Sequence, residues 1–158
     1  TQGVSSAASD VYKRQIIAGV EDSQPVKNKF TLPKLKSKRL ITKTVCRHAA
    51  LIANEIKASA VCTLTHSGYT GWQISSWRPN CLVLVFTSNK RILSQLNLLW
   101  GVKCIYYNKF QSTDKTVEDV NALAIKNRYV RRGDVVVNLA SMPIKDKGQV
   151  NTLRITKL

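Results

Sequence analysis

From residue 42 onward, the chain alternates segments of helical periodicity with short apolar runs. Helices are predicted at about 43–57, 69–77, 88–101 and 114–128, and strands at 60–65, 81–87, 102–107, 135–140 and 151–156. Parallel strands joined by right-handed helical crossovers are the rule for such a series. We therefore expect an α/β fold, a three-layer sandwich with a five-stranded, mostly parallel sheet.

The last two predicted strands are separated by a loop of about ten residues that contains no helix. A connection this short lets two strands pair antiparallel, whereas parallel strands need a longer crossover. Residues 151–156 also alternate as an edge strand does. The last strand is therefore predicted to lie antiparallel at one edge of the sheet.

Caps and inward faces can be assigned to several of the predicted helices. The expected N-caps are Thr42 or Thr44, Ser88 and Thr113. The first helix has an apolar stripe that should face the core, formed by Val45, Ala49, Ile52 and Ile56. Gly101 stands where a helix commonly ends on a left-handed residue.

The first 41 residues differ in composition from the rest of the chain. Residues 1–15 are mostly small and polar, and residues 26–43 contain seven Lys and Arg but no acidic residue. We expect residues 1–41 to form a flexible basic N-terminal segment and residues 42–158 to form the folded domain. Residues 5–15 also resemble a translated sequencing adapter, in which case residues 1–15 are an artefact.

Composition narrows the class of protein. The 158 residues, 44% of them apolar, suit one ordinary domain with a packed core. Lys and Arg number 25 against 9 Asp and Glu, and the resulting net charge of +16 should attract phosphate-bearing partners. No apolar run reaches the roughly 18 residues of a membrane span, and the start does not have the pattern of a secretory signal. We therefore expect a soluble, cytoplasmic protein without a membrane partner.

The residue types that commonly serve catalysis or metal binding are not arranged for either. Cys46, Cys62, Cys81 and Cys104 are 16, 19 and 23 residues apart among apolar neighbours, which favours buried free thiols over a metal site or a disulfide. Gly-rich phosphate loops, the nucleophile elbow and zinc-protease motifs are missing from the sequence. His48 is interpreted as a partly buried packing residue. We predict no catalytic residue, no metal site and no cofactor in this chain.

The best candidate site is the turn after the first predicted strand, with the sequence Thr65-His66-Ser67-Gly68-Tyr69-Thr70. Open α/β sheets bind ligands at the carboxyl ends of their strands, where helix N-termini offer N–H groups to anions. Three hydroxyls and the N–H groups around Gly68 could surround one phosphate without any catalytic side chain. The alternative is that Ser and Thr only cap the short helix. A nucleophilic pair of His66 and Ser67 is disfavoured, because adjacent turn residues rarely align for proton transfer.

A second candidate is the loop before the last predicted strand, which contains Lys145 and Lys147. These two cations could reach a second anionic group, and the loop could act as a lid. The alternative is a solvated connector, since charged residues are common in loops.

Six blocks of the sequence, in order and at suitable spacing, resemble the C-terminal domain of pyruvate kinase. The blocks are residues 64–70 (LTHSGYT), 77–80 (WRPN), 85–89 (VFTSN), 96–102 (LNLLWGV), 132–136 (RGDVV) and 151–155 (NTLRI). The resemblance covers about residues 42–158. Residues 140–144 (ASMPI) are most similar to bacterial members of the Bacteroidetes type.

The resemblance implies a regulatory and assembly domain of a glycolytic enzyme that transfers a phosphoryl group from phosphoenolpyruvate to ADP. In the family, Mg²⁺ and usually K⁺ act in a separate (β/α)₈ barrel that precedes this domain, so the present chain alone is expected to be inactive. The residues before 42 would be a remnant of the connection from that barrel. Family members are commonly homotetramers in which these domains meet, which makes the edge strand at 151–156 a candidate subunit contact.

The resemblance also implies an effector site for a sugar phosphate. One phosphate would lie in the turn, at Thr65, His66, Ser67, Gly68, Tyr69 and Thr70, and the other end of the ligand would meet the late loop, at Lys145, Lys147, Gly148 and Asn151. Members that bind fructose 1,6-bisphosphate often have basic residues at the positions of His66 and Tyr69, so the identity of the effector stays open. The alternative function is a stand-alone basic module that binds nucleic acid or another polyanion, which rests on charge alone.

Overall fold

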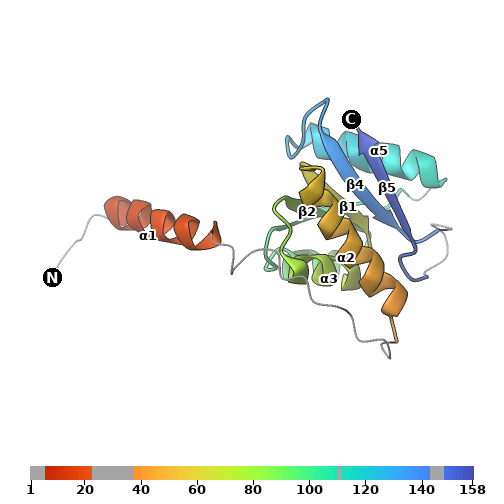
Figure 1. Cartoon of the computed structure of the whole chain (residues 1–158), viewed down its shortest axis with the longest axis horizontal. Helices are drawn as coiled ribbons and strands as arrows, with labels where there is room; N and C mark the ends of the chain where they lie inside the picture. Colours follow the sequence, from red (N-terminus) through yellow and green to blue (C-terminus); the bar gives the residue numbers. More distant parts are fainter. Residues whose placement is uncertain (1–5, 23–37, 110–111, 143–147) are drawn as a thin grey trace.

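A computed structural model of the chain describes residues 6–22, 38–109, 112–142 and 148–158 (Figure 1). Its centre is a five-stranded sheet with the order β3-β2-β1-β4-β5. The strands are β1 (Ala60–Leu64), β2 (Leu82–Thr87), β3 (Val102–Tyr106), β4 (Val135–Ala140) and β5 (Thr152–Lys157). Strand β1 pairs in parallel with β2 and β4, and β2 with β3, whereas β5 runs antiparallel to β4. The expected α/β class and mixed sheet are confirmed.

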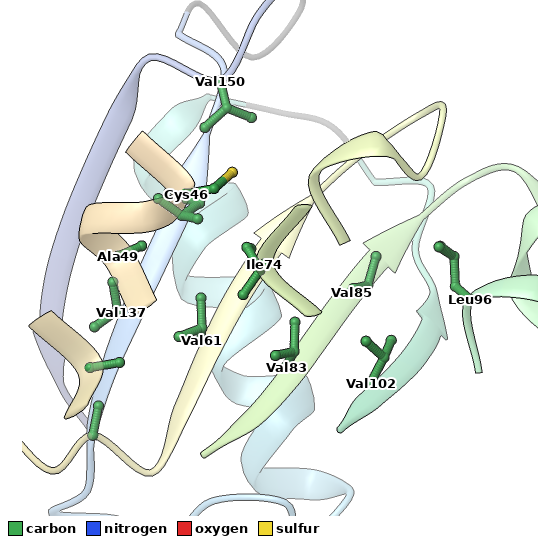
Figure 2. Packing of buried hydrophobic residues seen from close by; sticks show 13 residues of the cluster. Cys46, Ala49, Val61, Ile74, Val83, Val85, Leu96, Val102, Val137 and Val150 are labelled. Atoms are coloured by element: carbon green, nitrogen blue, oxygen red, sulfur yellow. The ribbon is translucent and has the colours of Figure 1, made fainter. Parts of the chain in front are cut away.

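Helices cover both faces of this sheet. They are α2 (Leu40–Glu55), α3 (Tyr69–Trp77), α4 (Lys90–Leu96) and α5 (Thr113–Lys126). Residues of α2, α3 and α4 share one hydrophobic cluster with the strands, and residues of α5 share another with the opposite face. Figure 2 shows the first cluster, with Ile74 of α3 and Ala49 of α2 lying over the strands. The result is the predicted three-layer sandwich.

Strand β2 shows why its sequence is apolar at nearly every position. Successive side chains of a strand point to opposite faces of the sheet. Val83 and Val85 therefore pack in the cluster with α3, while Leu84 and Phe86 pack in the cluster with α5, and all four are fully buried. Because helices cover both faces, a polar residue in this run would have no route to water.

The buried face of helix α2 overlaps the apolar stripe that we expected but includes smaller residues beside it. Its buried residues are Thr42, Cys46, Ala49, Ala50 and Ala53. Of the expected stripe, Ala49 is buried, Val45 and Ile52 are half-buried, and Ile56 lies beyond the helix and is exposed. The buried residues are small, which lets the helix backbone approach the sheet and α3 closely. Val45 and Ile52 still pack against the same hydrophobic cluster, so they lie at the border of the buried face.

The expected N-caps Thr42 or Thr44, Ser88 and Thr113 are wrong. Arg39 is the N-cap of α2 and makes no capping bond with its side chain. Asn89 caps α4 by accepting from the N–H of Arg91 at 3.1 Å, and Ser112 caps α5 by accepting from the N–H of Lys115 at 3.5 Å. In α4 and α5 the observed N-cap directly precedes or follows the predicted one in the sequence. Asn and Ser are both favoured at N-caps.

The segment expected to be a flexible arm contains a helix, α1, over Ser6–Glu21. Its Ala, Arg, Gln and Lys residues have high helix propensity, and Lys13 lies 3.8 Å from Asp10 one turn away. From residue 7 to residue 22 the side chains are exposed, apart from half-buried Ser9. Local propensity rather than burial therefore explains the helix.

The histidine and cysteine side chains differ in burial. His48 is exposed, with Nδ1 lying 2.8 Å from the carbonyl oxygen of Thr44, so the expectation of a partly buried packing residue is wrong. All four cysteines are free: Cys46 and Cys62 are buried, and Cys81 and Cys104 are half-buried.

None of the described helices is both long and apolar enough to cross a membrane.

Candidate functional site

The strand order places both candidate loops at the carboxyl ends of two neighbouring strands, β1 and β4. The chain proceeds from β1 outward through β2 to β3 and then returns to add β4 on the other side of β1. The order therefore reverses between β1 and β4, and ligands of open α/β sheets bind outside the carboxyl ends of the strands at such a point. The turn at residues 65–70 follows β1, and the loop that begins at residue 141 follows its parallel neighbour β4.

The turn is held by hydrogen bonds to its own hydroxyl groups. The N–H of Gly68 donates to Oγ1 of Thr65 at 3.0 Å, and the N–H of Tyr69 donates to Oγ of Ser67 at 3.5 Å. Gly68 is the N-cap of α3, with a left-handed φ of 81°. These bonds fix the position of the two hydroxyl oxygens, whereas the N-cap itself is Gly68 and no side-chain capping bond forms there.

Further N–H groups in the first turn of α3 have no hydrogen-bond acceptor within the helix. The first N–H of α3 with such an acceptor is that of Trp72, which donates to the carbonyl of Gly68 at 3.1 Å. The N–H groups of Thr70 and Gly71 precede it, and N–H groups at this position are available to an anion. Gly71 also lets α3 lie close to the sheet, since a Cβ there would be 2.9 Å from Cγ2 of Val85.

Exposure divides the six turn residues into three groups. His66 and Ser67 are exposed, Thr65 and Tyr69 are half-buried, and Gly68 and Thr70 are buried. A ligand from solvent would therefore meet His66 and Ser67 first. No hydrogen bond joins these two side chains among those of the described residues, which agrees with the low weight given to a nucleophilic pair.

Asn89 links the candidate turn to the end of β2. Its Nδ2 donates to the carbonyl oxygen of His66 at 3.4 Å, and its own N–H donates to Oγ1 of Thr87 at 3.1 Å. The same side chain caps α4. One residue thus holds the loops after β1 and β2 together, a role that the sequence analysis missed because it assigned the cap to Ser88.

Arg39 is a further residue at this site that the sequence analysis missed. Its guanidinium carbon lies 4.4 Å from the centre of the Tyr69 ring, a cation–π contact. The sequence analysis placed Arg39 in the N-terminal segment rather than in the domain. Because α2 begins at Leu40, this exposed cation is instead fixed beside the turn.

The late loop is described only in part. Lys145 and Lys147 lie outside the described residues, and Gly148 is exposed. Asn151 closes the base of the loop, since its Oδ1 accepts from the N–H of Met142 and its Nδ2 donates to the carbonyl of Met142, both at 2.8 Å. The amide oxygen and the amide nitrogen of Asn151 both bond the main chain of Met142, so this residue holds the base of the loop together.

The described residues do not assemble a metal centre. Over residues 6–22, 38–109, 112–142 and 148–158, no group of three or more His, Cys, Asp and Glu side chains could hold a metal ion. The arrangement at the turn offers main-chain N–H groups, hydroxyls and a nearby guanidinium. Such a set suits binding of an anion.

Comparisons with known proteins agree on one family. The family model "Pyruvate kinase, alpha/beta domain" matches residues 43–156. Pyruvate kinase of Sporosarcina psychrophila is 34% identical over 115 residues, which are 73% of this chain and 20% of that protein. Pyruvate kinase of Clostridium acetobutylicum is 34% identical over 103 residues, which are 65% of this chain and 22% of that protein.

A solved structure shares the fold. The crystal structure of a pyruvate kinase from Cryptosporidium parvum superposes with a TM-score of 0.68 at 21% identity, over 79% of this chain and 23% of that chain. The chain thus spans about a fifth of the length of the curated relatives that it matches. With the family model matching 43–156 and the same sheet in the structure, the chain belongs to the pyruvate kinase alpha/beta domain family.

Proposed function

We propose that this chain is the C-terminal regulatory and oligomerisation domain of a glycolytic pyruvate kinase and that it binds a phosphorylated effector. In the full-length enzyme the reaction would transfer a phosphoryl group from phosphoenolpyruvate to ADP. The observation that supports effector binding is the turn at residues 65–70, at the point where the strand order reverses. Effector binding to this domain would regulate the phosphoryl transfer, which takes place in another part of the enzyme.

The chemistry of the turn favours a phosphate group as the bound part of the effector. Ser67 is exposed beside the N–H groups that open α3, where the helix dipole favours negative charge. Arg39 adds a cation at 4.4 Å from the Tyr69 ring, and the whole chain has a net charge of +16. In this proposal Arg39 supplies the charge that basic residues supply elsewhere in the family, while His66 and Tyr69 contribute contacts without a fixed charge.

The Mg²⁺ and K⁺ of the family reaction do not fit the described part of this chain. In the part of the chain that the structure describes, no three or more Asp, Glu, His and Cys side chains come together in a group that could hold a metal ion. No step of the reaction is therefore assigned to this domain. In the proposal, both ions belong to the catalytic barrel of the full-length enzyme. The 158-residue chain alone should therefore show no turnover of phosphoenolpyruvate and ADP in an assay coupled to lactate dehydrogenase.

Assembly and origin form the rest of the proposal. Strand β5 lies at the edge of the sheet, with Ile155 50% exposed, and would contact a second copy in a homo-oligomer. The sequence of residues 140–144 supports a bacterial enzyme of the Bacteroidetes type. A glycolytic role implies a cytoplasmic enzyme.

Replacing Ser67 with Glu tests the effector site. The new carboxylate would occupy the position proposed for the phosphate, so calorimetric titration of Ser67→Glu with fructose 1,6-bisphosphate or inorganic phosphate should show no binding. Ser76→Glu is the matched control, because Ser76 is also exposed but lies near the C-terminal end of α3, whereas Ser67 precedes the N-cap of this helix. The control should bind as the unchanged chain does, and equal affinity of all three proteins would remove the turn from the proposal.

The same titrations separate the effector site from the polyanion alternative. Binding to unrelated single-stranded DNA should be weak under the proposal. Under the alternative, unrelated DNA and RNA bind strongly, the affinity falls steeply with salt, and Ser67→Glu has little effect on it because many cations share the contact.

A further inference from the structure

Two arginines stack on aromatic rings at opposite ends of helix α3. The guanidinium carbon of Arg39 lies 4.4 Å from the centre of the Tyr69 ring, at the first residue of the helix. The guanidinium carbon of Arg78, the C-cap of the helix, lies 4.4 Å from the centre of the Trp100 ring. The two contacts are alike in distance, but only the first lies beside the candidate turn. The pair at the far end of α3 is therefore an internal control for the pair at the turn.

Helix α2 and the Tyr69 ring together set the position of Arg39. Arg39 is the N-cap of α2, and its carbonyl oxygen accepts from the N–H of Lys43 at 3.0 Å, while its side chain makes no capping bond. An unrestrained arginine side chain loses conformational freedom when it binds an anion, whereas a stacked one has lost part of that freedom beforehand. The ring therefore prepares the guanidinium for binding.

The stacked guanidinium of Arg39 keeps its N–H groups for a ligand. Stacking uses the flat face of the group, whereas its five N–H donors lie around the edge. Arg39 is exposed, and no ion pair or side-chain hydrogen bond between described residues involves it. A full positive charge is thus held in place and turned to solvent.

This charge lies beside the turn rather than within it. The ring is at the far end of the Tyr69 side chain from the Tyr69 main-chain N–H, which donates to Oγ of Ser67 at 3.5 Å. A phosphate group on the N–H groups that open α3 would occupy the turn itself. The guanidinium over the ring is therefore placed for a second anionic group of the same ligand.

We propose that Arg39 determines the specificity of the effector site by binding the second anionic group of a bisphosphate, and that Tyr69 is a positioning residue for Arg39; this role rests on the proposed function. The resemblance instead places the far end of the ligand at the late loop. Here that end moves to the start of α2, while the other phosphate stays in the turn. A ligand with one phosphate uses the turn alone.

Calorimetric titration of the full chain with three ligands tests the role of Arg39. Fructose 1,6-bisphosphate should bind more tightly than fructose 6-phosphate, and inorganic phosphate reports on the turn alone. Arg39→Gln should weaken binding of the bisphosphate about tenfold, as expected for the loss of a charged hydrogen bond. It should change the affinity for the other two ligands by less than about twofold, because an exposed charge is screened by salt. Arg78→Gln, the matched control, should leave all three affinities unchanged.

Variants of Tyr69 test the positioning role. Tyr69→Leu removes the ring and should weaken binding of the bisphosphate by up to about fivefold, as expected for an exposed cation–π contact. Tyr69→Phe keeps the ring and should bind as the unchanged chain does. In the Arg39→Gln background, Tyr69→Leu should have no further effect, because the ring then has no cation to hold. Equal losses in both backgrounds, or a loss of inorganic phosphate binding by Tyr69→Leu, would refute the positioning role.

The specificity role of Arg39 has its own contrary results. It is overturned when Arg39→Gln binds the bisphosphate as tightly as the unchanged chain, or loses inorganic phosphate to the same extent. It is also overturned when the unchanged chain binds the two sugar phosphates equally, or when Lys147→Gln in the late loop removes the preference instead. Each of these results leaves phosphate binding by the unchanged chain, and with it the proposed function, intact. When the unchanged chain binds none of the three ligands, the proposed function fails as well.

Discussion

Gly68 combines two constraints at the candidate turn. Its φ of 81° lies in the left-handed region, and a Cβ there would lie 3.1 Å from Cδ2 of Leu96. The substitution Gly68→Ala should therefore lower the free energy of unfolding by about 1–2 kcal/mol from backbone strain, plus a further loss from crowding of buried Leu96. Urea denaturation of the two proteins measures the difference.

Gly101 supplies the control for this prediction. Its φ of 64° is also left-handed, but nothing lies within 4 Å of a Cβ built on it. Gly101→Ala should lose only the backbone part of the free energy. If both variants are destabilised equally, contact with Leu96 does not contribute to the conformation of the turn.

The residues of the candidate site were predicted where they are neighbours in sequence and missed where they are not. Thr65 to Thr70 are contiguous, so the turn and its hydroxyls can be identified from the sequence. Arg39 and Asn89 reach the same turn from the starts of α2 and α4. Their positions depend on how the helices pack, which the spacing of residues along the chain does not contain.

At the scale of elements, Asn97 joins the end of α4 to the exposed edge of the sheet. Its Nδ2 donates to the carbonyl of Leu93 at 3.1 Å, and its Oδ1 accepts from the N–H of Cys104 in β3 at 2.8 Å. It thereby satisfies a main-chain donor of an edge strand that would otherwise be available to another chain. Asn97→Ala should cost about 1–1.5 kcal/mol of stability in thermal or urea unfolding, as expected for the loss of these hydrogen bonds.

Asn127 is the matched control, because it is also a helix C-cap and its Nδ2 donates to the carbonyl of Leu123 at 2.8 Å. No strand contact of its side chain occurs among the described hydrogen bonds. Asn127→Ala should therefore cost less than Asn97→Ala. A larger loss at Asn127 would show that the helical bond, rather than the strand contact, stabilises the protein.

The elements themselves were largely predictable, and their ends and faces were not. The apolar run of β2 predicts a strand buried on both faces, as observed. The expected stripe of α2 was chosen by hydrophobicity. Ile52 does pack against the core cluster, but Cys46 and Ala53 are buried more completely. Close approach of a helix favours small side chains, and that distance is set by the neighbouring elements rather than by α2 alone.

At the scale of the whole molecule, topology followed from connection lengths. Helical crossovers predict the parallel pairs, and the short loop before β5 predicts its antiparallel pairing with β4. The position of β4 beside β1 was not predicted, because either edge of a growing sheet accepts a right-handed crossover. That choice brings the loops after β1 and β4 to one place and so creates the candidate effector site.

The buried thiols connect the core to the pH dependence of the whole domain. Burial raises the pKa of Cys46 and of Cys62 from 9.0 to about 12. In the unfolded chain these thiols ionise near their ordinary pKa, whereas in the folded chain they keep their protons until near pH 12. A group with a raised folded pKa stabilises the protein fully below the unfolded pKa and loses this contribution as the pH rises.

The free energy of unfolding should therefore fall as the pH rises from 9 toward 12, by about 1.4 kcal/mol per pH unit for each of the two thiols. Other side chains contribute to the same slope, among them Cys81, whose pKa burial raises to about 11, so the slope of a single protein does not isolate Cys46 and Cys62. The variant Cys62→Ala removes one thiol and leaves those groups in place. Its stability, measured by urea unfolding between about pH 8 and pH 11, should start lower but fall less steeply than that of the unchanged chain, and parallel curves would show that Cys62 ionises equally in the folded and unfolded states.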